Sequence, residues 1–181
     1  MAGSEAFSCR LAAIVFDRDQ DPDAPLAAFL AGEAARGHTI AGWLQQREPV
    51  ENCACADYSL ISLTTGERLT VMQDLGREAT GCRLDPGAIA VAARELGTAL
   101  ARRPALLVAN RFGKLEVEGG GMVAEIGEAV AEGAALIVCV PLRFLGAWNA
   151  FAAGLDAQLP PRREAIEAWW ASVAPRRASA A

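Results

Sequence analysis

The chain has 181 residues, of which 52% are hydrophobic and 22% are charged, and its formal net charge is −5 at pH 7. This length is enough for one domain with a sizeable core, and the composition argues against a disordered chain. Because neutralising nucleic-acid phosphates requires a basic face, the acidic balance argues against nucleic-acid binding.

The sequence contains no apolar run of about 20 residues, so we expect no membrane insertion. Residues 1–10 lack a basic segment followed by an apolar core, which argues against a signal peptide. The five cysteines form no disulfide framework pattern, and their odd number is typical of a reducing cytoplasm. We therefore expect a cytoplasmic protein with one domain over residues 10–174, an N-terminal extension (1–9) and a flexible tail (175–181).

The first part of the chain predicts a strand, a helix and a second strand. Residues 10–16 are an apolar run typical of a buried strand. A helix is expected to begin near Pro25, which a first helical turn tolerates, and to end at Gly37. Residues 39–45 predict the second strand. A strand, helix and strand in this order indicate a parallel sheet.

A hairpin and a further helix are expected next. Residues 58–63 and 68–73 alternate in character around a glycine-containing turn, which predicts two antiparallel strands. Asp85 then precedes Pro86, as expected of a residue that caps a helix beginning with proline.

The second half of the chain predicts two more buried strands among helices. Residues 105–109 and 135–140 are continuous apolar runs, as expected of strands covered on both faces. Helical stripes follow over residues 144–155 and 166–173, separated by a connector at 159–161. The pattern as a whole predicts an α/β fold of three layers with a mostly parallel sheet and a β-hairpin insert.

A polar, glycine-rich stretch follows the strand expected at 105–109. Ligands bind at the carboxyl ends of strands in open α/β sheets. Arginine and lysine suit phosphate-like or molybdate-like oxyanions, and glycines allow close approach to the backbone. The residues alone leave a second interpretation open, a solvated turn in which Arg111 and Lys114 pair with Glu116 and Glu118. The candidate ligand-binding residues here are Asn110, Arg111, Gly113, Lys114, Glu116, Gly119, Gly120 and Gly121.

The order of these elements resembles that of small P-loop nucleoside-triphosphatases. In that family a strand ends in an acidic pair within the pattern Asp-Glu-x-Gly-x-x-Glu. Gly113 and Glu116 match its glycine and final glutamate, whereas Ala109, Asn110 and Arg111 stand where the acidic pair would be. The resemblance implies a fold of P-loop NTPase type.

The loop after the first strand departs from that family. A phosphate loop requires G-x-x-x-x-G-K-[ST], in which glycine amides and a lysine contact phosphate. Residues 17–24 contain four aspartates and a proline, with no glycine or lysine. We interpret this as a degenerate phosphate loop and do not expect ATP or GTP hydrolysis by the usual mechanism.

Two motifs together resemble an uncharacterised bacterial family related to those NTPases. They are Gly-Cys-Arg-Leu-Asp at residues 81–85 and Asn-Arg-Phe-Gly-Lys-x-Glu at residues 110–116, followed by the glycine cluster. The resemblance covers most of residues 11–155. Genes of that family often lie near molybdate-transport and molybdenum-cofactor genes, which implies a role in molybdenum metabolism.

Three other groups carry chemistry in principle. Cys82, Arg83 and Asp85 are a second group of candidate ligand-binding residues, in which Cys82 would be a reactive or metal-binding thiol. The alternative is a buried cysteine, with Arg83 and Asp85 forming a local ion pair and helix cap. Cys53 and Cys55 are either soft metal ligands or incidental loop cysteines. Asp17 and Asp19 either hold Mg²⁺ or form a solvated acidic loop.

These observations favour a non-hydrolytic accessory protein that binds a small anionic ligand, either a molybdate-like oxyanion or a nucleotide phosphate. One alternative is a divergent nucleotide hydrolase or transferase, with Glu116 as general base and Asp17 or Asp19 holding Mg²⁺. Another is a scaffold that docks on a protein partner, or forms a homodimer, through its C-terminal aromatic helices.

Overall fold

The structure, a computed structural model, describes residues 9–49, 56–72 and 84–175. The expectations for Cys53, Cys55, Cys82 and Arg83 lie outside the described residues, as do those for residues 1–8 and 176–181. Among the described helices, none is long and apolar enough to cross a membrane.

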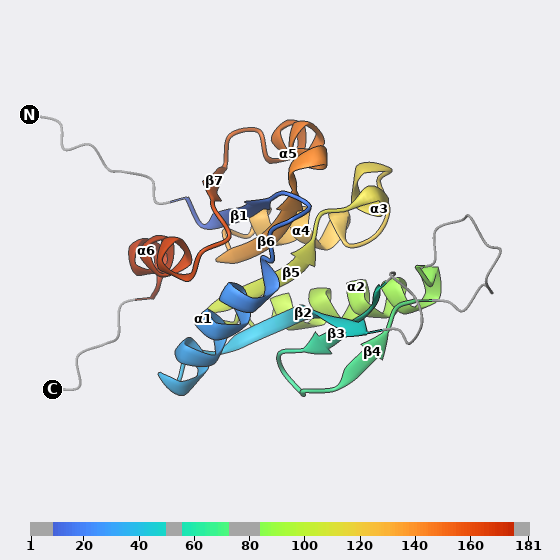
Figure 1. Cartoon of the computed structure of the whole chain (residues 1–181). Coiled ribbons are helices and arrows are strands. Elements are labelled where there is room, and N and C mark those ends of the chain that lie inside the picture. Colours follow the sequence, from blue (N-terminus) through green and yellow to red (C-terminus); the bar gives the residue numbers. More distant parts are fainter. Residues whose placement is uncertain (1–8, 50–55, 73–83, 176–181) are drawn as a thin grey trace, which may run out of the picture.

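The described strands form one seven-stranded sheet in the order β4-β3-β2-β5-β6-β1-β7 (Figure 1). β2, β5, β6, β1 and β7 are parallel neighbours, and the antiparallel strands β3 and β4 extend the sheet beyond β2. The predicted mostly parallel sheet with a hairpin insert is confirmed. The strands are β1 (Leu11–Phe16), β2 (Ile40–Pro49), β3 (Ala56–Ser62), β4 (Arg68–Thr70), β5 (Leu106–Arg111), β6 (Leu136–Pro141) and β7 (Asp156–Leu159).

Helices cover both faces of this sheet, which makes three layers. α1 (Asp23–Ala35) and α6 (Arg163–Val173) pack on one face. α2 (Pro86–Ala101), α4 (Val123–Ala131) and α5 (Leu145–Ala152) pack on the other. Two short segments, α3 (Lys114–Val117) and the 3₁₀ turn η1 (Leu142–Phe144), follow β5 and β6.

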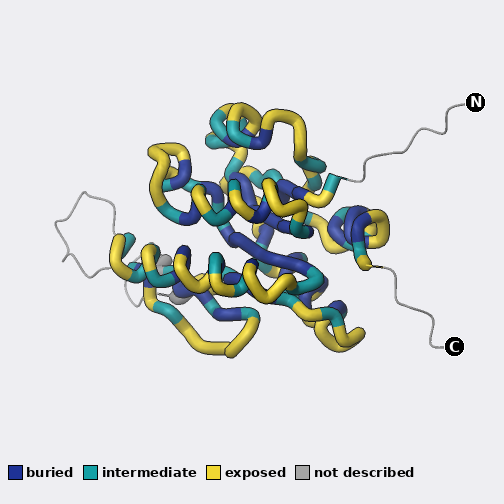
Figure 2. The backbone as a smooth tube through the Cα atoms, turned by 180° about the vertical axis from the view of Figure 1, so that it is seen from behind, coloured by how far each residue is buried: buried dark blue, intermediate teal, exposed yellow. Residues whose placement is uncertain are grey.

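The central strands are buried on both faces because their side chains alternate between two cores. In β1, Leu11 and Ala13 contact the core under α2, whereas Ala12 and Ile14 contact the core under α1 and α6. Figure 2 shows these strands as a buried centre surrounded by helices with exposed outer sides. The continuous apolar runs of the sequence are explained by this two-sided burial.

One glycine is required where β2 pairs with β5. Gly42 has φ +106°, and a Cβ atom at this position would lie 2.1 Å from the carbonyl oxygen of Val108. Because only glycine avoids both the strain and the overlap, Gly42 permits the close approach of these two strands.

A polar network joins α1 to α6 on the face of the sheet opposite α2. Glu33 is buried and accepts hydrogen bonds from Trp170 Nε1 at 2.8 Å, from His38 Nδ1 at 2.7 Å and from Arg36 Nη1. Although burial opposes ionisation, these hydrogen bonds and the charge of Arg36 hold the pKa of Glu33 below its ordinary value. The network helps to fix α6 against α1.

The end of the chain differs from the prediction. The helix expected over residues 144–155 ends at Ala152, because Ala153 and Gly154 adopt positive φ angles of 50° and 79°. The expected connector at 159–161 was wrong in part, since Leu159 ends β7, which pairs with β1. β7 is a four-residue edge strand with no fully buried residue, so it has no apolar run to reveal it.

Candidate ligand-binding site

A cavity of about 930 Å³ opens at the carboxyl edge of the sheet. Its walls come from residues 16–18 after β1, residues 110–116 after β5 and residues 141–144 after β6, together with the hairpin and α2. β1 and β6 are neighbours, but β1 continues into α1 on one face and β6 into α5 on the other. A crevice forms at such a switch point, so the fold itself places this cavity.

Asn110 lies in the cavity wall at a β-bulge. Ala109 pairs with Val138 and Arg111 with Cys139, so Asn110 is the extra residue of β5 and the strand runs two residues further than predicted. Its side chain is fully buried, and neither Oδ1 nor Nδ2 has a hydrogen-bond partner among the described residues. Such an amide costs about 1–3 kcal/mol unless a ligand or water satisfies it.

Arg111 is held by contacts from three elements. Its Nη2 donates to Asp23 Oδ2 at 2.7 Å, its Nε donates to Gln45 Oε1 at 3.2 Å, and its guanidinium lies 4.6 Å from the centre of the Phe16 ring. Its Nη1 is buried and has no partner within the described part of the chain. Arg111 therefore pairs with Asp23 on α1, and not with Glu116 or Glu118 as a solvated turn would require.

The partner of Arg111 has a perturbed pKa. Burial raises the pKa of Asp23 to about 6, because lost hydration and the charge of Asp21 outweigh the opposing charge and hydrogen bond of Arg111. At pH 7 the pair is thus an ion pair formed against a cost of desolvation.

Glu116 is buried and both of its carboxylate oxygens are occupied. Oε2 accepts from the Gly113 N–H at 2.9 Å, and Oε1 accepts from the Met122 N–H at 3.0 Å. A Cβ on Gly121, whose φ is +62°, would lie 1.9 Å from Glu116 Oε1. The carboxylate therefore organises the loop around α3, and Gly121 leaves room for it.

The predicted glycines differ in whether they line the cavity. Gly113 lines the cavity, whereas Gly119, Gly120 and Gly121 are not among the described residues that line it. The helix after the cluster begins at Val123, and its preceding residue Met122 is held by Glu116.

Four basic side chains line the cavity where the chain leaves β1, β5 and β6, a region called the basic end below. Lys114 and Arg111 belong to the predicted motif, and the structure adds Arg18 and Arg143. Lys114 is exposed and lies 3.7 Å from Glu118, a weak surface pair. Sequence reasoning missed Arg18 and Arg143, although each follows the end of an apolar strand by two residues, which is the signal that could have identified them.

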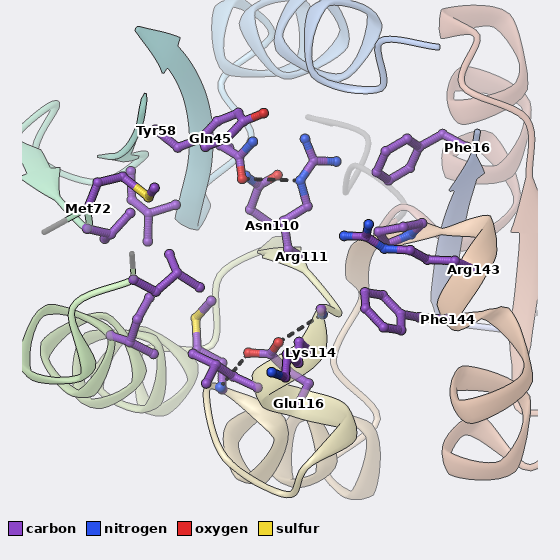
Figure 3. Close-up of a pocket in the computed structure, with 18 of the residues that line it drawn as sticks. Phe16, Gln45, Tyr58, Met72, Asn110, Arg111, Lys114, Glu116, Arg143 and Phe144 are labelled. Atoms are coloured by element: carbon purple, nitrogen blue, oxygen red, sulfur yellow. Dashed lines mark hydrogen bonds between the residues drawn. The ribbon is translucent and has the colours of Figure 1, made fainter. Parts of the chain in front are cut away.

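The other end of the cavity is apolar (Figure 3). Tyr58 and Met72 of the hairpin region face it on one side, and Figure 3 shows Asn110 and Arg111 between them and the side chains of Phe16 and Arg143. The lining residues that the hairpin region and α2 contribute define the apolar end, and they are Tyr58, Leu60, Val71, Met72, Leu84 and Ile89.

The loop between β1 and α1 uses its own side chains to satisfy its amides. Asp21 Oδ1 accepts from the N–H groups of Asp23 at 2.8 Å and Ala24 at 3.3 Å, at the start of α1. Asp17 Oδ1 accepts from the Arg18 N–H at 2.7 Å. A carboxylate thus occupies the helix end that binds phosphate in P-loop proteins.

The remaining predicted residues are placed as follows. Asp17 lines the cavity and Asp19 does not. Asp85 caps α2, accepting from Gly87 N at 2.8 Å and Ala88 N at 3.4 Å, which confirms the predicted cap, and its neighbour Leu84 lines the cavity. The described residues contain no cluster of three or more His, Cys, Asp or Glu side chains that could hold a metal ion.

The fold is of P-loop NTPase type, as comparison with solved structures shows. The crystal structure of THEP1 from the hyperthermophile Aquifex aeolicus superposes with a TM-score of 0.61 at 11% identity, covering 85% of this chain and 91% of that one. The solution structure of a human cancer-related nucleoside triphosphatase gives a TM-score of 0.61 at 11% identity over 83% and 88% of the two chains.

Residues 11–169 match the family described as "Protein of unknown function (DUF2478)", and the chain belongs to this family. It is also 33% identical over 168 residues to the "Molybdenum import ATP-binding protein ModC 2" of Bradyrhizobium diazoefficiens. That alignment covers 92% of this chain but 19% of the relative, so the chain spans about a fifth of its length.

Proposed function

We propose that this protein binds a small anionic ligand at the carboxyl edge of its sheet and does not hydrolyse it. The observation that carries the proposal is the buried amide of Asn110, which lacks hydrogen-bond partners among the described residues and lies in the wall of a cavity with a basic end. Buried polar groups are normally satisfied, so an unpaired amide in a cavity supports a binding role.

The absence of hydrolysis is proposed because the residues that would perform it are already engaged. Asp21 accepts two backbone N–H groups at the start of α1, the position that binds phosphate in P-loop proteins, and both oxygens of Glu116 accept backbone N–H groups. A carboxylate used in this way is a poor base or water-orienting group. We assign Glu116 a positioning role, which keeps Lys114 at the mouth of the cavity.

A link to molybdenum metabolism is supported by the similarity to a protein named for molybdenum import. We propose that this protein is an accessory of that metabolism and that its ligand is either a molybdate-like oxyanion or a molecule carrying a phosphate. The basic residues Arg18, Lys114 and Arg143 would contact the anionic group. Arg111 Nη1, which has no partner in the described part of the chain, would add a fixed donor.

Isothermal titration of the full chain with molybdate, tungstate, ATP and GTP tests the proposal. Saturable binding of at least one of them, weakened by Arg143→Ala, is the expected result. No binding by a folded sample would refute the binding role. Release of phosphate from ATP or GTP by the wild-type chain would refute the non-hydrolytic role. Its loss in a Glu116→Gln sample that remains folded would favour the hydrolase alternative.

A further inference from the structure

We infer that the ligand of this cavity is an organic anion with a planar ring, and that the ring lies in the apolar end between the hairpin and α2. The inference rests on the proposed anion-binding function and chooses between the two ligand classes left open there. It follows from three features of the site: its volume, its division into two ends and the chemistry of Asn110.

The cavity is larger than an inorganic oxyanion requires. Its volume of about 930 Å³ is within the range of sites that enclose drug-sized organic ligands. A tetrahedral oxyanion bound among Arg18, Lys114 and Arg143 would fill the basic end alone. The apolar end would then hold water against leucine, isoleucine, valine and methionine side chains, which is unfavourable.

The apolar end has the lining expected around a ring. Tyr58 and Met72 lie on the hairpin side (Figure 3). Ile89, in the first turn of α2, also lines the cavity. Aromatic and methionine side chains pack well on flat rings. A ring in this position would remove apolar surface of two structural elements from water at once.

The amide of Asn110 is best satisfied by a ligand that offers both a hydrogen-bond acceptor and a hydrogen-bond donor. Nδ2 is a donor and Oδ1 is an acceptor, and both are unpartnered within the described chain. Molybdate, which is fully deprotonated at neutral pH, offers acceptors only, so it could satisfy Nδ2 but not Oδ1. A ring edge that presents one donor beside one acceptor, such as a lactam or an aminopyrimidine, pairs with both atoms of an asparagine amide.

Asn110 also stands at the right place for this pairing. It is the residue that the bulge in β5 adds, and Arg111 follows it at once. Arg111 Nη1 lacks a partner in the described structure and is available to an acceptor on the same ligand. Figure 3 shows both residues between the apolar side of the cavity and the side that carries Arg143. A ligand that spans the cavity would therefore place its ring edge at Asn110 and its anionic group at the basic end.

Calorimetric titration with four probes tests the inference: molybdate and inorganic phosphate as bare anions, and guanosine 5′-monophosphate and pterin-6-carboxylate as ring anions with a lactam edge. We expect at least one ring anion to bind about tenfold or more tightly than either inorganic anion. Ile89→Ala should weaken that ring anion at least threefold, whereas Val91→Ala, a truncation on α2 outside the cavity lining, should not.

Asn110→Leu, which keeps the size of the side chain and removes its hydrogen bonds, should reduce the preference for the ring anion over molybdate about tenfold. Should this variant fail to fold, Ile89→Ala and Val91→Ala still decide the location of the ring. Molybdate binding at least as tightly as both ring anions would overturn the inference and leave the proposed function intact. Ring-anion binding unaffected by Ile89→Ala would also overturn it. Failure of all four probes and of tungstate, ATP and GTP to bind would instead refute the proposed function.

Discussion

Arg111 Nη2 and Asp23 Oδ2 lie 2.7 Å apart and connect β5 to the first turn of α1 across 88 positions of the sequence. The contact holds the guanidinium against the Phe16 ring and leaves Nη1 as its unpartnered nitrogen in the described structure. The carboxylate of Asp23 is half-buried, which makes the stability of the protein depend on pH.

Asp23→Asn should change that pH dependence in a defined direction. The pKa of Asp23 rises from 3.8 to about 6 on folding, so this group favours the folded state below pH 4 and loses that contribution as the pH rises to 6. The free energy of unfolding that the wild type loses in this way is about 1–3 kcal/mol. Relative to the wild type, Asp23→Asn should therefore gain free energy of unfolding between pH 4 and 7, measured by urea denaturation. Asp19→Asn, at an exposed position in the loop before α1, is the control. A difference between Asp23→Asn and the wild type that stays constant over this range would contradict the prediction.

Glu116→Gln should destabilise the protein by about 1–3 kcal/mol, because the amide NH₂ would face a backbone N–H donor in place of an acceptor oxygen. Both oxygens of Glu116 accept from N–H groups now, at 2.9 and 3.0 Å. Glu118→Gln, which alters an exposed carboxylate two residues away, should have little effect. Equal stability of the two variants in urea denaturation would rule out the loop-organising role.

Gly42→Ala should cost about 3 kcal/mol or more, since the new Cβ would overlap the Val108 carbonyl and φ at this position is +106°. Gly146→Ala is a matched control in α5, where a Cβ would enter open space. That variant should be unchanged or more stable by up to about 1 kcal/mol. Thermal unfolding of the two variants makes the comparison. A Gly42→Ala variant as stable as the wild type would mean that β2 and β5 are not packed as described.

Arg143→Ala should weaken about tenfold the binding of whichever of molybdate, tungstate, ATP or GTP the wild type binds. This is the effect of losing one charge-assisted hydrogen bond. Arg143 lines the basic end of the cavity after β6. Arg94→Ala removes the same charge from an exposed position on α2 that does not line the cavity. Titration at two salt concentrations separates a local contact from the change in net charge. Equal weakening by the two variants would show that only net charge matters.

Much of the fold could be predicted because burial on two faces leaves a strong pattern. The runs at 105–109 and 135–140 are apolar throughout, and Asp85 and Pro86 mark the start of α2 in a locally readable way. β7 could not be predicted, since an edge strand with partly exposed side chains has no such pattern.

The site was predictable in position but not in its connections. Its location at the end of β5 follows from the strand pattern and the polar residues after it. The pairing of Arg111 with Asp23 could not be read from spacing, because it depends on how α1 crosses the sheet. Local spacing suggested Glu116 as the partner of Arg111. In the structure the carboxylate of Glu116 instead accepts hydrogen bonds from two backbone N–H groups of its own loop.

His38 is the sole histidine of the chain, and its ring lies edge-on to Trp170 at 5.6 Å between centres. The imidazole proton resonances of this protein therefore come from a single residue, shifted by the ring current of one indole. They report whether α6 is seated on α1, on the side of the sheet away from α2. The packing of that helical layer can thus be followed by NMR with an unlabelled sample. A variant that alters only the cavity should leave these resonances in place, whereas one that loosens α6 from α1 should shift them.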